Sequence, residues 1–542
     1  MRPALSPLVG PPEASATRDT AAGGWSVALG RRGFILAVYG IVCVLLAIPV
    51  FSVVVPPLVD YPNHLARMHI LAAFNDSPAL RANYVVAWKL APYLAMDLIV
   101  PRLAGFMSIY TAGQVFLFFC LVQFVLGTAA VHAAVFRRLS PWPAASGLFA
   151  YSFVVSYGFV NYFFGIGVWL LAFAGWVVLS RRSVVWRILA GSVLSLAVFF
   201  SHFFAFFGYM LCVGAYELGV WLTARDRRFA ALIGRGAVAF CPFIAPLIIF
   251  AAVSSGQEGG PTLYATPYGW MVAMLSPTMF PGAPVDLAML ALLLIVPARR
   301  RLLGRLHMAP PMRVLSIVLG LVALAMPNTL EGVWGVDYRL PVVWLFLTIA
   351  GCSWIDVPSR VELPLAGFLV AVLAVNVGLI AWAWQPAGRQ FDEFRNALNV
   401  IPRGARVIAF RDEDGIVPSL SHEPAALYDH LPTLAIIERD AYVPYLFKNP
   451  MMPVAAAPAL RAVDTGVGKP IGLDAFRAGA DPVRGAAMLG TLNVMGMRNY
   501  WGAWRQHYDY AVELSFGAHP VLPAGLRRVA SGQIFNIYRI EP

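Results

Sequence analysis

Charged side chains are scarce in this chain of 542 residues. Asp, Glu, Lys and Arg together make up 13% of the sequence, whereas hydrophobic residues make up 59%. Soluble proteins carry about 25% charged residues, so this chain has too little polar surface to stand in water. Apolar runs of about 20 residues, long enough to cross a ~30 Å hydrocarbon core, recur along it. The composition therefore excludes a soluble protein and predicts one that spans a membrane many times.

Cysteine pairs and nucleotide-binding motifs are also missing. Each of the five cysteines lies in or beside an apolar run, and no two form a CxxC pair, so neither a disulfide framework nor a thiolate metal site is expected. The histidines, including those at 428–430 and 507–509, lack the spacing of metal ligands. We therefore expect no divalent metal and no other cofactor. The absence of a Walker motif excludes an ATP-driven pump.

The net charge of +12 resembles that of a nucleic-acid-binding protein, but the positions of the arginines argue against such a partner. They lie in short clusters between apolar runs, where basic residues fix the orientation of a membrane protein. Every second junction holds a cluster, and the alternate junctions hold few basic residues. We therefore expect the chain in the inner (plasma) membrane of a bacterium, with its N-terminus in the cytoplasm. The clusters lie at residues 31–32, 137–138, 181–187, 225–228 and 299–305.

The apolar runs predict an all-α polytopic membrane fold with about eleven transmembrane helices. Residues 1–30, rich in Pro, Ala, Gly and Ser, are expected to form a disordered tail, and residues 31–384 the transmembrane domain. A long outward loop, residues 56–112, follows the first span. The expected spans are residues 34–55, 114–135, 142–159, 162–179, 184–200, 203–222, 237–253, 287–296, 314–326, 340–354 and 365–384.

Residues 385–542 differ in composition and predict a small soluble α/β domain. Short runs rich in β-branched and aromatic residues alternate there with helical stretches. Because the expected number of spans is odd, this domain should lie in the periplasm. The expected strands are residues 405–410, 433–437, 508–514 and 534–540.

The outward loop opens with an acidic residue close to the membrane boundary. Beside a low-dielectric region, the carboxylate of Asp60 would be a stronger proton acceptor, which suits a general base. Helical spacing over residues 61–74 predicts an amphipathic helix lying in the membrane interface. His64 and Arg67 follow Asp60 at helical spacing if that helix begins at Pro62. The alternative is that Asp60 only caps the helix.

A second polar group opens the tenth expected span. Asp337, Tyr338 and Arg339 stand directly before its apolar residues. An arginine at the outer end of a span can bind a phosphate at the level of the lipid headgroups. The alternatives are that Arg339 only anchors the helix in the interface or that it pairs with Asp337.

Three more polar residues lie beside apolar runs on the same expected side. His202 marks a turn between two spans, Asp97 lies in a second helical segment of the outward loop, and Lys89 precedes that segment. Ionisable groups in or beside a membrane are costly and often functional. The alternative for each is an interfacial side chain without a role in chemistry.

This organisation resembles that of the GT-C superfamily of membrane glycosyltransferases. One span, a long outer loop that begins with an acidic residue, many further spans and an outward soluble domain follow one another in the family's order. Asp60 is similar to the family's first-loop acidic residue, and the segment 338–341 is similar to the start of a late span in several members. Many members carry a second carboxylate beside the first. Tyr61 and Pro62 stand there in this chain, which argues against a metal-dependent version.

By that resemblance, the chain would be an inverting glycosyltransferase whose sugar donor is linked to polyprenyl phosphate. Its partners would be this donor and membrane lipid. The resemblance does not identify the acceptor. Asp60 would deprotonate the acceptor hydroxyl. Arg339, with His202 or Lys89, would stabilise the departing lipid phosphate. Direct attack with a single base implies inversion at the anomeric carbon. The other expected substrate-binding residues are His64, Arg67, Asp97, Asp337 and Tyr338.

Two other classes of protein fit the composition. A transporter of envelope glycolipids needs paired broken helices and charges near the membrane midplane, whereas the ionisable groups of this chain gather on its expected outer side. A non-catalytic membrane scaffold would need only the C-terminal domain as a docking module. Such a scaffold would keep its function after Asp60→Asn.

Overall fold

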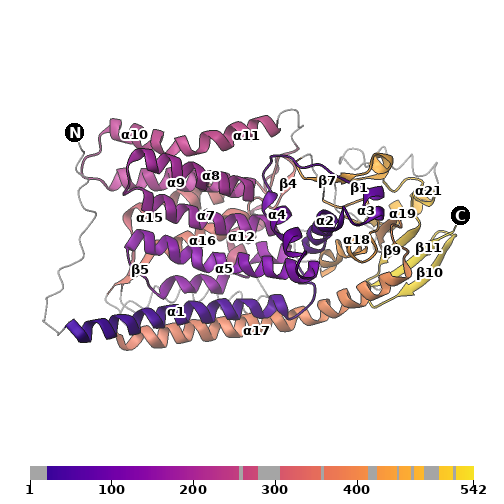
Figure 1. The fold of residues 1–542 in the computed structure, drawn as a ribbon, viewed down its shortest axis with the longest axis horizontal. Helices are drawn as coiled ribbons and strands as arrows, with labels where there is room; N and C mark the ends of the chain where they lie inside the picture. Colours follow the sequence, from indigo (N-terminus) through magenta and orange to yellow (C-terminus); the bar gives the residue numbers. More distant parts are fainter. Residues whose placement is uncertain are drawn as a thin grey trace.

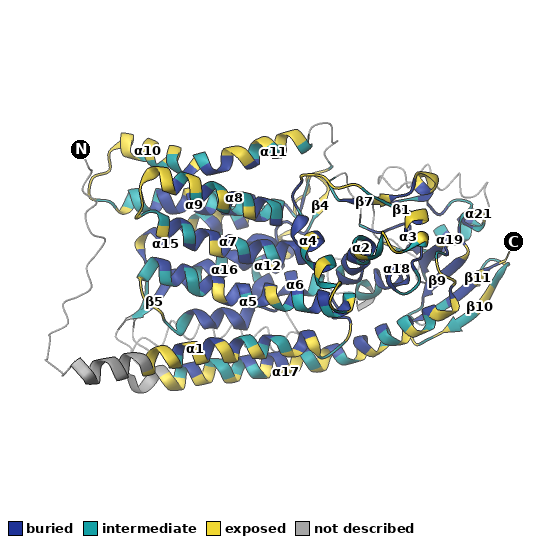
Figure 2. Ribbon diagram, viewed as in Figure 1, coloured by how far each residue is buried: buried dark blue, intermediate teal, exposed yellow. Residues whose placement is uncertain are grey.

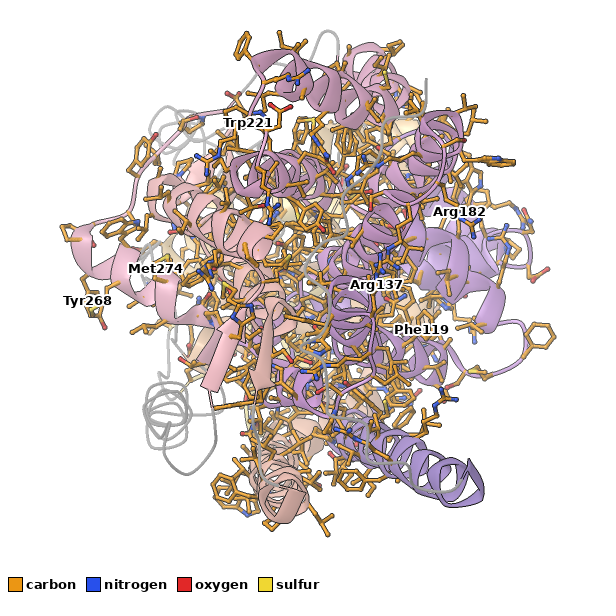
Figure 3. All side chains as sticks on the ribbon, turned by 90° about the vertical axis from the view of Figure 1, so that its left-hand side faces the viewer. Phe119, Arg137, Arg182, Trp221, Tyr268 and Met274 are labelled. Carbon is orange, nitrogen blue, oxygen red and sulfur yellow. The ribbon has the colours of Figure 1, made fainter. Side chains whose placement is uncertain are left out.

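The computed structural model describes residues 21–254, 260–278, 305–355, 359–412, 424–447, 451–465, 469–480, 500–516 and 521–541. These residues form a bundle of helices with a smaller, C-terminal domain at one end (Figure 1). We call this end of the bundle the domain end. We call the opposite end, which Figure 3 shows face-on with Arg137 and Arg182 labelled, the arginine end.

Among the described residues, seven helices are long and apolar enough to cross a membrane, which confirms a multi-pass membrane protein. The count of about eleven spans is not confirmed. The shorter apolar helices α15 (Pro310–Ala325) and α16 (Arg339–Gly351) correspond to the ninth and tenth expected spans, and the eighth, residues 287–296, lies outside the described residues. The seven lie in α1 (Ala21–Phe51), α5 (Ile109–Phe136), α7 (Val160–Leu179), α8 (Val184–Ser201), α9 (Phe203–Thr223), the run of α10 (Phe229–Phe240), η2 (Cys241–Phe243) and α11 (Ile244–Ser254), and α17 (Ser359–Ala397) with η4 (Leu398–Val400).

The third expected span, residues 142–159, is not one α-helix. It consists of the 3₁₀ helix η1 (Trp142–Phe149) and the short helix α6 (Phe153–Tyr157). The segment still follows the whole length of α16, because the indole of Trp142 donates to the Ile349 carbonyl at 3.0 Å and Phe153 stacks on Tyr338 at 4.4 Å. A 3₁₀ helix rises about 2.0 Å per residue, so it crosses the same depth with fewer residues than an α-helix. Pro143, which has no N–H to donate, stands in its first turn.

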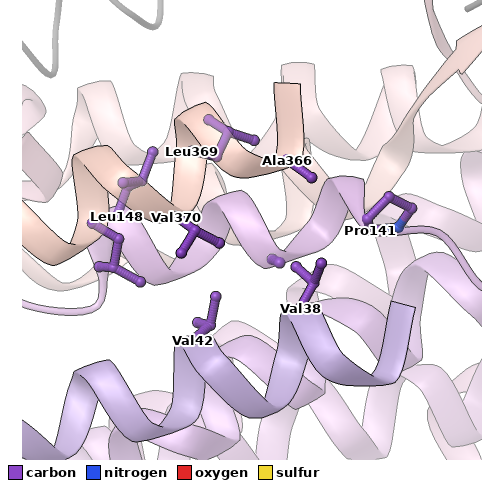
Figure 4. A pocket seen from close by; sticks show the side chains of 9 residues that line it. Val38, Val42, Pro141, Leu148, Ala366, Leu369 and Val370 are labelled. Atoms are coloured by element: carbon purple, nitrogen blue, oxygen red, sulfur yellow. The ribbon is translucent and has the colours of Figure 1, made fainter. Parts of the chain in front are cut away.

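Helices α1 and α17 run side by side along the bundle, and α17 continues into the C-terminal domain (Figure 1). At 1.5 Å per residue its 39 residues extend about 58 Å, longer than a ~30 Å hydrocarbon core. The expected domain boundary at 384/385 therefore falls inside a continuous helix. A small crevice between α1, η1 and α17 is lined by apolar residues, among them Val38 and Val370 (Figure 4). Without polar groups it offers nothing to hold a sugar or a phosphate.

The C-terminal domain contains a mixed five-stranded sheet in the order β10-β11-β9-β6-β8, consistent with the expected mixture of helices and strands. Strand β6 pairs in parallel with β8 and β9, and the other pairs are antiparallel. The expected strand 433–437 is instead helical, because an apolar run without periodicity fits either structure. The strands are β6 (Val407–Arg411), β8 (Ile471–Gly472), β9 (Tyr510–Leu514), β10 (Leu526–Ser531) and β11 (Phe535–Ile540), and the helices are η5 (Pro424–Tyr428), η6 (Leu431–Thr433), α18 (Leu434–Arg439), η7 (Pro458–Val463), α19 (Leu473–Gly479) and α21 (Trp504–His507).

The first loop lies between the bundle and this domain. Its helix α2 (Tyr61–Ala73) confirms the expected helix, but the helix packs on α18 of the domain and on α4 (Leu94–Leu103), so most of its residues are buried (Figure 2). Protein therefore covers the faces that were expected to meet the membrane interface. After α3 (Pro78–Asn83), strand β1 (Tyr84–Val86) pairs with β7 (Val454–Ala456) of the C-terminal part. The loop and the domain thus form one structure.

Shorter elements join the remaining helices. The antiparallel pairs are β2 (Arg305–Met308) with β5 (Cys352–Ile355), and β3 (Thr329–Leu330) with β4 (Val333–Trp334). The second pair forms a hairpin directly before Asp337. Helix α12 (Pro267–Leu275) and η3 (Ser276–Thr278) pack against α16.

Candidate functional site

Asp60 is held in place by the backbone of α6. Its N–H donates to the Tyr157 carbonyl at 2.9 Å, and the N–H of Val59 donates to the Ser156 carbonyl at 3.1 Å. Gly158 allows this approach, since its φ of +84° favours glycine and a β-carbon there would lie 3.0 Å from the Asp60 nitrogen. The broken third span therefore positions the acidic residue of the first loop.

The side chain of Asp60 does not cap α2. Asp60 stands at the N-cap position, but its φ and ψ are helical and its side chain forms no capping hydrogen bond within the described chain. The alternative of a purely capping residue is therefore not supported. Instead, Asp60 Oδ1 lies 3.3 Å from Nε2 of His430, a buried residue of the C-terminal domain.

His430 is a site residue that sequence reasoning missed. It lies far from Asp60 along the chain, and the histidine beside Asp429 was considered only as an unlikely metal ligand. Its Nδ1 lies 3.0 Å from the amide nitrogen of Asn63, so the ring is held on both sides by residues of the first loop. No local pattern in the sequence could have indicated this contact, because it depends on the docking of the domain.

Arg339 is buried among aromatic rings. Its guanidinium carbon lies 4.6 Å from the ring centre of Phe159 and 4.7 Å from that of Phe204, and the residue is 8% exposed. Within the described residues no carboxylate lies at ion-pairing distance, and Nε has no hydrogen-bond partner. Its Nη2 donates to the Trp334 carbonyl at 3.4 Å. Asp60 and Asp337 interact with this cation electrostatically from farther away.

Both alternatives for Arg339 therefore lose support. Asp337 does not pair with it but accepts from the side-chain amide of Asn328, with both contacts at 3.2 Å. Nor does the arginine extend into an open interface, since rings enclose it. Burial raises the pKa of Asp337 to about 6. Tyr338 is buried and stacks on the ring of Phe153.

His202 and His64 extend the same cluster. The ring of His202 lies 4.7 Å from that of Tyr93 and 5.1 Å from that of Tyr162, whose hydroxyl donates to the Arg339 carbonyl at 2.8 Å. Burial, with the charge of Arg339, holds the pKa of His202 well below its ordinary value. Nδ1 of His202 accepts from the N–H of Phe204, which places its one proton on Nε2.

His64 has a buried nitrogen that no neighbour satisfies. Its Nδ1 has no hydrogen-bond partner within the described chain. Burial holds the pKa of His64 well below its ordinary value, and the charge of Arg67 acts in the same direction. His64 is therefore a neutral ring with a polar atom available to a ligand.

The remaining expected site residues lie elsewhere. Arg67 and Asp97 form an ion pair at 3.0 Å, with side chains 0% and 1% exposed, and thereby join α2 to α4. Such a pair occupies both charges and holds the first loop together. Lys89 is exposed in the segment after β1, unlike the buried Arg339.

The structure therefore brings together Asp60, His64, His202, the 337–339 segment and His430 at the junction of bundle and domain. The cluster offers a carboxylate, a cation without a described carboxylate at ion-pairing distance, histidines and aromatic rings. Within the described residues, no three His, Cys, Asp or Glu side chains are placed to share a metal ion.

Fold and cluster together define a multi-pass membrane protein with a cluster of polar side chains between its helices and its C-terminal domain. No known family model matches the sequence, and no curated protein is significantly similar to it.

Proposed function

We propose that the chain is an inverting glycosyltransferase that moves a sugar from a polyprenyl-phosphate-linked donor to an acceptor at the outer face of a bacterial inner membrane. The observation that carries the proposal is Arg339, a buried guanidinium without a nearby carboxylate, in the same cluster as Asp60. It begins an apolar helix at the domain end of the bundle. That is where the phosphate of a membrane-embedded lipid would meet the protein.

A buried charge without a partner costs several kcal/mol, and an anionic ligand would offset that cost. A guanidinium can donate to two phosphate oxygens at once, which suits a phosphate better than a single ammonium would. The rings on either side of Arg339 exclude water and hold its plane. They also provide apolar surface for the first part of a lipid chain.

Asp60 would accept the proton of the acceptor hydroxyl as its oxygen attacks the anomeric carbon. The new glycosidic bond forms as the bond from that carbon to the phosphate oxygen breaks, and the lipid phosphate leaves with the electron pair. Arg339 stabilises the charge that develops on the phosphate. One displacement from the face opposite the leaving group inverts the anomeric centre.

The charge distribution supports this orientation. Arg137 and Arg182, from two of the arginine-rich junctions, lie at the end of the bundle opposite to the C-terminal domain (Figure 3), and such junctions commonly face the cytoplasm. The cluster and the domain would then face the periplasm. A transporter would hold its polar groups near the middle of the bundle, and a scaffold would not require the buried cation.

Thermal unfolding of the purified full chain with polyprenyl phosphate tests the proposal. The melting temperature of the wild type should rise with the phosphate but not with the uncharged polyprenol. Arg339→Lys should lose most of that rise, and Arg138→Lys, at the arginine end, should keep it. An equal rise for phosphate and polyprenol would show that Arg339 does not recognise the headgroup.

A further inference from the structure

The hydrogen bonds around Asn63 fix the orientation of its amide. The backbone N–H of Phe447 donates to Asn63 Oδ1 at 2.7 Å, and Asn63 Nδ2 donates to the Tyr445 carbonyl at 3.1 Å. A backbone N–H only donates and a carbonyl only accepts, so the oxygen and the nitrogen of this amide cannot be exchanged.

That orientation determines where His430 carries its proton. Nδ2 of Asn63 faces Nδ1 of His430 at 3.0 Å and has only hydrogens to offer, so Nδ1 must accept. In a neutral imidazole the proton is then on Nε2, the atom that lies 3.3 Å from Asp60 Oδ1. This distance is long for a hydrogen bond, as contacts between catalytic groups commonly are before a substrate binds.

We propose that His430 is a positioning residue for Asp60: its Nε2–H holds the carboxylate, and Asn63 fixes the histidine tautomer. This inference rests on the proposed role of Asp60 as the base. The side chain of His430 is 3% exposed, and its ring lies 4.8 Å from the ring of Phe447, so it is confined to one orientation. The C-terminal domain thereby completes the site and is not a separable docking module.

The same geometry excludes a proton relay through His430. A relay would need a ring nitrogen free to accept the proton that Asp60 takes from the acceptor. Nε2 already carries a proton, and Nδ1 is occupied by the Asn63 amide. Asp60 is therefore the final acceptor of the proton within this pair.

Nitrogen-15 NMR of the full chain with labelled histidine tests the tautomer without any substrate. The chain has 9 histidines, and the His430 signals are those lost in His430→Gln; His507→Gln is the matched control. We expect a neutral ring with the proton on Nε2. In Asn63→Asp, a carboxylate faces Nδ1 and should draw a proton onto it. A wild-type ring protonated on Nδ1, or on both nitrogens at neutral pH, would overturn the proposal.

Asp60→Asn gives a second readout should a histidine variant fail to fold. It changes the group that faces Nε2, so the Nε2 signal of His430 should shift while its Nδ1 signal changes little. An unchanged spectrum would mean that the two side chains do not interact.

With a donor that the wild type turns over, two substitutions separate positioning from packing. His430→Gln can place an amide N–H near the position of Nε2, whereas His430→Asn keeps only a polar atom near Nδ1. We expect the Asn variant to lose roughly tenfold to a hundredfold in kcat with little change in KM, and the Gln variant to recover most of it. Equal activity of both variants and the wild type contradicts the positioning role. Wild-type inactivity with every donor would contradict the glycosyltransferase instead and leave the NMR result to decide the tautomer.

Discussion

Each end of the bundle contains a buried arginine, but only one of the two arginines forms an ion pair with a described carboxylate. At the arginine end, Arg187 of α8 lies 4.0 Å from the ring centre of Trp176 and forms an ion pair with Glu217 of α9. Arg235 of α10 binds the other oxygen of Glu217 at 3.1 Å, and the Trp176 indole donates to that side chain at 3.1 Å. At the domain end, Arg339 also lies over aromatic rings, but no described carboxylate pairs with it.

The difference separates a structural charge from one that can bind a ligand. In the Glu217 group each arginine has a carboxylate oxygen at ion-pairing distance, and the three side chains tie α8, α9 and α10 together. The free-energy cost of burying the Arg339 guanidinium would be offset only by an anion from another molecule. The same residue type in a similar aromatic setting therefore differs in its nearest carboxylate, and we propose that this difference separates a structural arginine from a ligand-binding one.

The largest predicted effect, which is all or none, concerns the side of the membrane that each end of the bundle faces. We expect alkaline phosphatase fused at Pro542 to be active, because the enzyme folds only outside the cytoplasm. The same reporter fused after Arg182, at the arginine end, should be inactive. An active reporter after Arg182 would reverse the assignment of the two ends and place the cluster in the cytoplasm.

Removal of the base should have the next largest effect. Asp60→Asn should lower the rate of sugar transfer about a hundredfold to ten-thousandfold, the range for loss of general-base catalysis. The protein should insert at the wild-type level, since the Asp60 side chain makes no capping bond that Asn would lose. Transfer to a membrane-lipid extract, divided by the amount of inserted protein, is the measurement. Wild-type transfer by this variant would remove Asp60 from the mechanism.

A pair of Arg→Lys substitutions tests the comparison itself. Arg339→Lys should lower kcat about a hundredfold, because one donor to a developing charge is worth ~3 kcal/mol, while the melting temperature stays near that of the wild type. Arg187→Lys should have the opposite effect: the free energy of unfolding falls by about 1 to 3 kcal/mol, and turnover per folded molecule is unchanged. If both variants lose stability and keep turnover, Arg339 is structural as well.

The smallest predicted effect concerns pH. Burial raises the pKa of Asp337 to about 6, so this side chain is neutral below pH 6 and gains a negative charge above it. That charge competes with a phosphate for Arg339. Two charges 4 Å apart in water interact by ~1 kcal/mol, and Asp337 lies farther than that from Arg339, so binding of polyprenyl phosphate should weaken by less than about fivefold across this range, relative to Asp337→Asn.

The comparison with Asp337→Asn is needed because a phosphate monoester also titrates near pH 6. The Kd ratio of the two proteins at each pH cancels that common change. A ratio that stays constant from acid to neutral pH would show that Asp337 does not influence the site. The raised pKa of Asp337 also predicts how stability depends on pH. A carboxyl whose pKa is raised in the folded state favours folding at low pH, and this contribution to stability is lost as the pH rises through 6.

The sequence was sufficient to predict most of the apolar helices and to single out Asp60 and Arg339 as candidate site residues. Hydropathy reports which residues avoid water, and a charge beside an apolar run is conspicuous for the same reason. Hydropathy does not report which partner covers a helix. For that reason α2 was expected in the membrane interface, whereas α4 and α18 cover it.

The features that the sequence did not predict were missed for particular physical reasons. The segment 142–159 is apolar enough to cross, but it is divided between η1 and α6, and hydropathy does not distinguish a broken crossing from a regular α-helix. The run 433–437 is buried on every side, so it has neither the period of a helix nor that of a strand. His430 meets Asp60 only because α18 docks on α2, a tertiary contact that no local pattern encodes.

Asn63 and His430 are in contact although 367 residues separate them in the sequence, and this separation determines when the site can form during synthesis. Ribosomes add about 5 to 20 residues per second, so roughly 20 to 70 seconds separate the synthesis of the two side chains. During that interval Asp60 has emerged, but the histidine that faces it has not been made. A nascent chain anchored in the bilayer therefore lacks a complete site until its last domain has been delivered and has folded against the first loop.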